Sequence, residues 1–157
     1  MVREVQRHAR RKHWKLLPST SVPIGAQIFD SIWAMWRKRC IGTGEVRKYK
    51  DRLNAHGGQQ IHGISYWDTF APVVMWTTIR LVLKLTLIDQ WKSRQLDFVL
   101  VYPQSDIEGT LFMKLPKGFE LDSNENRKTH VLQLLKNIYG LKQAGRVWNK
   151  HLHRGAN

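Results

Sequence analysis

The sequence has 157 residues, which suits one domain or a fragment of a larger one, and its 42% apolar and 10% aromatic content argues against a disordered tail. A single cysteine, Cys40, excludes an internal disulfide and a multi-cysteine zinc site, and no apolar run reaches the roughly 20 residues of a membrane span. The 26 Lys and Arg residues against 12 Asp and Glu give a net charge of +14, which favours nucleic acid over a membrane surface as partner.

Residues 1–22 are predicted to form a basic N-terminal arm and a loop. The arm covers residues 1–15, is compatible with a helix, and ends at Trp14, and the loop runs from Pro18 to Pro23. No apolar stretch follows the basic arm, as it would in a signal peptide. We therefore expect an intracellular protein, in a cytoplasmic particle or the nucleus, that is neither secreted nor membrane-bound.

A basic two-stranded ribbon is predicted next. Residues 27–39 and 45–55 have strand character, and Gly42-Thr43-Gly44 separates them as a turn. Lys50 and Arg52 alternate onto one face of the second strand, where they could bind the phosphates of a nucleotide or template. A basic face that is exposed to solvent and binds no ligand would produce the same pattern.

The rest of the chain mixes short apolar segments with helices. Residues 79–90 predict a helix that is apolar nearly all round and therefore buried. Residues 96–101 predict a buried central or parallel strand that contains Asp97, which is either a metal ligand or a turn-capping aspartate. The remaining predictions are a strand at residues 111–115, a polar loop at 120–128, a strand or helix at 131–138 and a helix at 141–152. The pattern indicates an α+β fold with one core.

Three blocks of sequence carry a family resemblance. The first consists of Tyr49–Leu53 (YKDRL), Thr69–Val74 (TFAPVV) and Thr78–Arg80 (TIR); the second of Gln95–Val99 (QLDFV) and Leu115–Phe119 (LPKGF); the third of Ile138–Trp148 (IYGLKQAGRVW). In this order and spacing they resemble the reverse transcriptase of copia-type LTR retrotransposons (Pseudoviridae).

The resemblance implies an α+β right-hand polymerase, with residues 23–157 as its fingers and the first half of its palm, truncated there. It implies RNA-directed DNA synthesis, a nucleotidyl transfer, with an RNA template, a DNA primer and deoxynucleotide triphosphates as partners. Asp97 matches the first palm aspartate, a ligand of the catalytic Mg²⁺ ions. Tyr102 matches an aromatic gate against the ribose 2′-hydroxyl, and an ordinary strand aromatic is the alternative there. Gly140 and Gln143 belong to the block that lines the nucleotide and template side of the palm.

The sequence also departs from the family pattern. Relatives take two further magnesium ligands from a downstream Tyr-x-Asp-Asp turn, whereas no adjacent Asp-Asp pair occurs in this chain. We therefore expect a fragment of the polyprotein that is inactive alone. The alternatives are a catalytically dead, basic nucleic-acid-binding module and a decayed transposon remnant without selected function.

Overall fold

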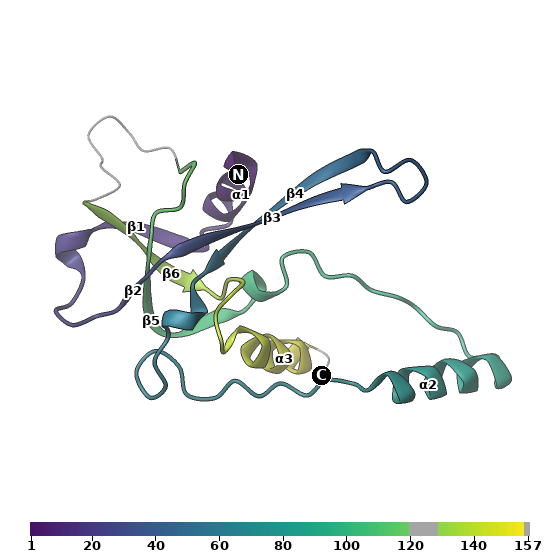
Figure 1. The fold of residues 1–157 in the computed structure, drawn as a ribbon. Coiled ribbons are helices and arrows are strands. Elements are labelled where there is room, and N and C mark those ends of the chain that lie inside the picture. Colours follow the sequence, from purple (N-terminus) through teal and green to yellow (C-terminus); the bar gives the residue numbers. More distant parts are fainter. Residues whose placement is uncertain (120–128, 156–157) are drawn as a thin grey trace.

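The computed structural model describes residues 1–119 and 129–155, and its centre is a four-stranded sheet (Figure 1). The strand order is β1-β6-β5-β2, in which β2 runs parallel to β5 and the other neighbours are antiparallel. The bounds of the strands are Trp14–Pro18 for β1, Ile28–Phe29 for β2, Asp106–Lys114 for β5 and His130–Lys136 for β6. The mixture of helices and sheets confirms the coarse α+β prediction. The loop predicted at residues 120–128 lies outside the described residues.

The predicted basic ribbon is confirmed. Strands β3 (Ser31–Arg39) and β4 (Val46–Ala55) pair antiparallel and project from the sheet as a long hairpin (Figure 1). At its tip the Cys40 amide donates to the Glu45 carbonyl over 2.9 Å, and the Gly44 amide donates to the Cys40 carbonyl over the same distance. The base of the ribbon is buried at Leu53 and Ala55, while its outer half is exposed. The ribbon is thus anchored at one end.

The core lies where the sheet meets the base of the ribbon. Phe29, Met113, Leu132 and Ile138 are among its fully buried side chains. The N-terminal arm forms helix α1 (Val2–Arg10), whose Val5 joins the same core. Strand β1, which continues from the arm, was not predicted.

In the described part of the last third of the chain, the predicted strands and helix are confirmed, although their ends differ. Strand β5 includes most of the predicted residues 111–115 but begins at Asp106. For residues 131–138 the sequence allowed a strand or a helix, and the structure has a strand there, β6. The predicted C-terminal helix is α3 (Ala144–Gly155). No helix in the described part of the chain is long and apolar enough to cross a membrane.

The predicted burial of the helix at residues 79–90 is wrong. Helix α2 (Trp76–Ile88) forms, but none of its residues is buried, and Leu87 and Ile88 are 79% and 74% exposed. The prediction assumed that this chain covers its own apolar helix. Irregular segments on both sides instead carry α2 away from the sheet (Figure 1).

The predicted strand at residues 96–101 is also wrong. Residues 91–98 have no regular structure, and a turn follows at residues 99–101. Leu100 has a φ of 55°, in the left-handed region, which a residue in a strand ladder does not adopt. Asp97 therefore lies on an irregular segment rather than on a strand.

Candidate nucleic-acid interface

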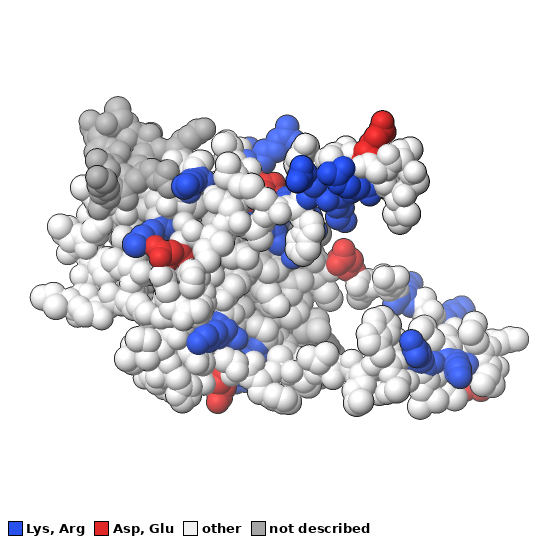
Figure 2. Space-filling view, in the orientation of Figure 1, with Lys and Arg blue, Asp and Glu red and all other residues white. Residues whose placement is uncertain are grey.

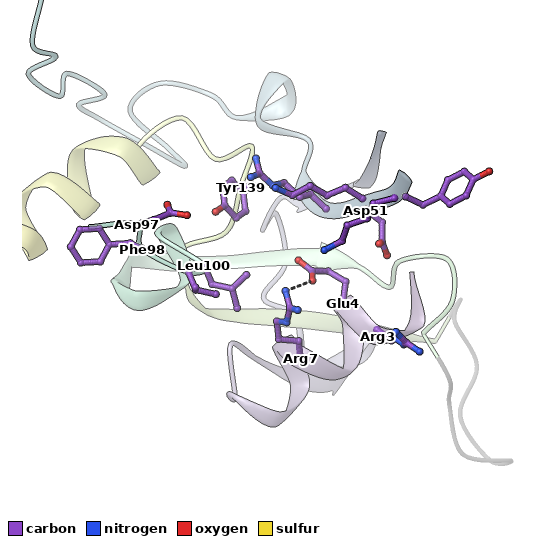
Figure 3. A pocket seen from close by; sticks show the side chains of 13 residues that line it. Arg3, Glu4, Arg7, Asp51, Asp97, Phe98, Leu100 and Tyr139 are labelled. Carbon is purple, nitrogen blue, oxygen red and sulfur yellow. Dashed lines mark hydrogen bonds and ion pairs between the residues drawn. The ribbon is translucent and has the colours of Figure 1, made fainter. Parts of the chain in front are cut away.

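A cavity of about 440 Å³ lies between α1, β4 and the segment at residues 97–100 (Figure 3). It brings together three of the predicted site residues, namely Lys50, Arg52 and Asp97. The remaining lining residues are Arg3, Glu4, Arg7, Lys48, Tyr49, Asp51, Phe98, Val99, Leu100 and Tyr139. We call this space the Asp97 cavity.

Strand pairing and ring packing position these side chains. Lys50 pairs with Trp36 and Arg52 with Ala34, so both cations lie on one face of the ribbon. On the opposite wall, Phe98 packs edge-on against Trp148 of α3, with ring centroids 5.2 Å apart. This contact and the burial of Leu100 hold the segment that carries Asp97.

Two of the three carboxylates in the Asp97 cavity are already engaged. Glu4 accepts a hydrogen bond from Arg7 over 3.1 Å, and a hydrogen bond with His8 lowers the pKa of the Glu4 carboxyl although the residue is buried. Asp51 pairs with the ammonium group of Met1, which lowers the pKa of that carboxyl.

Asp97 is the carboxylate that stays free. Within residues 1–119 and 129–155 it makes no hydrogen bond or ion pair, and in Figure 3 it points toward Tyr139. Five cations share its cavity: Arg3, Arg7, Lys48, Lys50 and Arg52. The balance of charge therefore favours an anionic ligand such as a phosphate chain.

Tyr139 is a lining residue that the sequence reasoning missed. The Arg52 guanidinium lies 4.9 Å from the centre of its ring, and the Tyr102 ring packs edge-on behind it at 4.9 Å. Tyr102 is half-buried, packs against the core, and does not line the Asp97 cavity. The only signal for Tyr139 was its place within the third sequence block.

Gly140 holds the base of the ribbon against the chain that follows β6. Its φ is 90°, and a β-carbon there would lie 2.1 Å from the carbonyl oxygen of Ala55. The Ala55 amide donates to the carbonyl of Tyr139 over 2.8 Å in the same place. The close backbone approach expected of this glycine thus occurs, and its partner is the ribbon.

Gln143 is buried outside the Asp97 cavity. Its Oε1 accepts a hydrogen bond from Nε2 of Gln60 over 2.9 Å, and Oε1 of Gln60 accepts one from the Lys142 amide over 2.7 Å. These bonds tie the start of α3 to the segment after the ribbon. Its predicted contact with nucleotide or template stays a prediction.

The described residues do not fit a pair of magnesium ions. No group of three His, Cys, Asp or Glu side chains that could hold a metal occurs among them. In the Asp97 cavity only Asp97 has a free carboxylate, whereas two ions roughly 4 Å apart need several oxygen ligands.

The sequence is similar to a family described as reverse transcriptase (RNA-dependent DNA polymerase), whose model matches residues 12–155. It is 36% identical over 135 residues to the retrovirus-related Pol polyprotein from transposon RE2 of Arabidopsis thaliana, a match that covers 86% of this chain. The corresponding protein from transposon TNT 1-94 of Nicotiana tabacum is 35% identical over 127 residues, or 81% of the chain. The chain spans about 9% of the length of each of these polyproteins. No solved structure matches.

Proposed function

Because the chain belongs to the reverse transcriptase (RNA-dependent DNA polymerase) family of copia-type transposon polyproteins, we propose that it binds the phosphates of nucleic acid or nucleotide for that enzyme. Residues 23–157 would be the fingers and first half of the palm of a right-hand polymerase, and residues 1–22 an N-terminal arm. The parent reaction would be RNA-templated nucleotidyl transfer to a primer 3′-hydroxyl.

The Asp97 cavity is the observation that carries this proposal. Lys50 and Arg52 come from the ribbon, and Asp97 lies 45 residues further along the chain, yet all three line one space of about 440 Å³. The guanidinium of Arg52 offers a planar fork to phosphate oxygens, and the ammonium group of Lys50 offers a compact charge. Neither forms an ion pair within the described residues, so both are available to a ligand.

The charge around Asp97 supports binding rather than catalysis by this chain. Reverse transcriptases generally use divalent metal ions, and Asp97 would supply one ligand. The other carboxylates of the Asp97 cavity, Glu4 and Asp51, are neutralised by neighbouring cations. Nucleic-acid binding is therefore the function that this chain can perform with its own side chains.

The test is the salt dependence of binding to short RNA and DNA, measured by fluorescence anisotropy. Each phosphate contact contributes about 0.7 to 0.9 to the slope of log K against log salt. The double variant Lys50→Gln/Arg52→Gln should therefore lower the slope by about 1.4 to 1.8.

The matched control is Lys92→Gln/Arg94→Gln, which removes the same charge from exposed residues outside the Asp97 cavity. We expect its slope to stay within experimental error of the unaltered chain. Equal slopes for the two double variants would show that net charge alone drives binding and would refute the site.

A further inference from the structure

Trp36 lies in the middle of the basic face of the ribbon. It pairs with Lys50, and its same-face neighbours are Lys38, which pairs with Lys48, and Ala34, which pairs with Arg52. The indole is 72% exposed. Figure 2 shows Lys and Arg side chains gathered over this outer part of the ribbon.

A groove of about 460 Å³ runs along this face. Its lining includes Trp36, Lys38, Lys50, Arg52 and Tyr139, and we call it the Trp36 groove. It shares Lys50, Arg52 and Tyr139 with the Asp97 cavity, so the two spaces adjoin. A chain of phosphates held by these two cations would therefore pass beside the indole.

No packing role in the described structure accounts for Trp36. Its ring contacts no other aromatic ring among the described residues, and its Nε1 donates no hydrogen bond to them. Trp33, three residues earlier, differs: it packs against the core and its Nε1 donates to the Lys117 carbonyl over 3.0 Å. An exposed indole between cations combines a flat apolar surface with charges that attract a polyanion.

We propose that Trp36 is a stacking platform for a base of single-stranded nucleic acid, whose phosphates are held by Lys38, Lys50 and Arg52. Same-face residues along a strand are about 6.8 Å apart, so cations flank the indole at regular intervals along the groove. A single strand can turn a base onto the ring, whereas the bases of a duplex are already stacked on each other. This inference rests on the proposed function and names its ligand class.

Trp36→Ala is the direct test, with binding to a single-stranded oligonucleotide measured by anisotropy. Loss of one stacked base should weaken binding by about 5- to 150-fold. The slope against salt should not change, because no charge is removed. Trp36→Phe keeps an aromatic face and should recover most of the affinity.

Three comparisons make the result specific. Trp76→Ala removes an indole that is 73% exposed and lies on α2, outside the Trp36 groove, and should leave binding unchanged. Trp36→Ala should also leave unchanged the binding of an abasic oligonucleotide, which has phosphates but no bases. Binding of a duplex should change by less than about twofold, because its bases cannot reach the ring.

Failure of this inference differs from failure of the proposed function. If Trp36→Ala binds single strands as the unaltered chain does, the stacking platform is refuted while phosphate binding stands. The same holds if the substitution weakens abasic and duplex binding as much as it weakens single-strand binding. If Lys50→Gln/Arg52→Gln leaves the salt slope unchanged, the proposed phosphate site itself is refuted.

Discussion

The backbone contact at Gly140 allows a stability prediction with a magnitude. Gly140→Ala forces an L-residue to a φ of 90°, which costs about 1–2 kcal/mol. Its new methyl group would also meet the carbonyl oxygen of Ala55 at 2.1 Å, and the neighbouring Ala55 to Tyr139 hydrogen bond must shift. Leaving that buried amide unpaired adds about 1–3 kcal/mol, so the total destabilisation should be about 2–5 kcal/mol.

The assay is urea-induced unfolding, followed by circular dichroism or pulse proteolysis. Gly109→Ala is the matched control, because Gly109 has a φ of 80° but nothing lies within 4 Å of the position that its new methyl group would take. The control should lose only the roughly 1–2 kcal/mol of the left-handed backbone. Equal losses for the two variants would refute the close approach of the ribbon to Gly140.

Three further predictions concern pH, activity and solubility. Burial lowers the pKa of His13 to about 4, so the unfolded chain binds a proton at His13 at a higher pH than the folded chain does. The free energy of unfolding should therefore fall by about 3 kcal/mol as the pH drops from about 6.5 to 4. Urea midpoints that depend on pH as strongly in His13→Gln as in the unaltered chain would contradict this. The chain alone should extend no primer with Mg²⁺ and template, and a product that Asp97→Asn abolishes would overturn the expectation. Leu87→Gln/Ile88→Gln should reduce aggregation, measured by size-exclusion chromatography, without lowering stability, because both side chains are exposed; unchanged aggregation would show that α2 is not its cause.

Local patterns predicted the elements that depend on neighbours in sequence. The alternating residues around Gly42-Thr43-Gly44 specify a hairpin, and the ribbon formed as expected. The edge strand β1 was missed because its partner β6 lies more than 110 residues away: Trp14 pairs with Leu134. The apolar pattern at residues 79–90 predicted a helix correctly, but an apolar surface does not specify what covers it.

The candidate site was predictable only in part. Period-two alternation placed Lys50 and Arg52 on one face, and the family resemblance drew attention to Asp97. The burial of Gln143, and the place of Tyr139 between Tyr102 and Arg52, depend on contacts between distant segments. Contacts between distant segments produce no periodic pattern in a single sequence.

The strand order β1-β6-β5-β2 has a consequence for the order in which the chain folds. The ribbon closes over the six residues 40–45, whereas β1 can pair only after His130 has been made, since His130 is the partner of Pro18. Bringing ends 112 residues apart together costs about 2–3 kcal/mol more loop entropy than closing the ribbon. During synthesis the basic hairpin should therefore form first, and its base should stay exposed until β6, the last strand of the sheet, has been made.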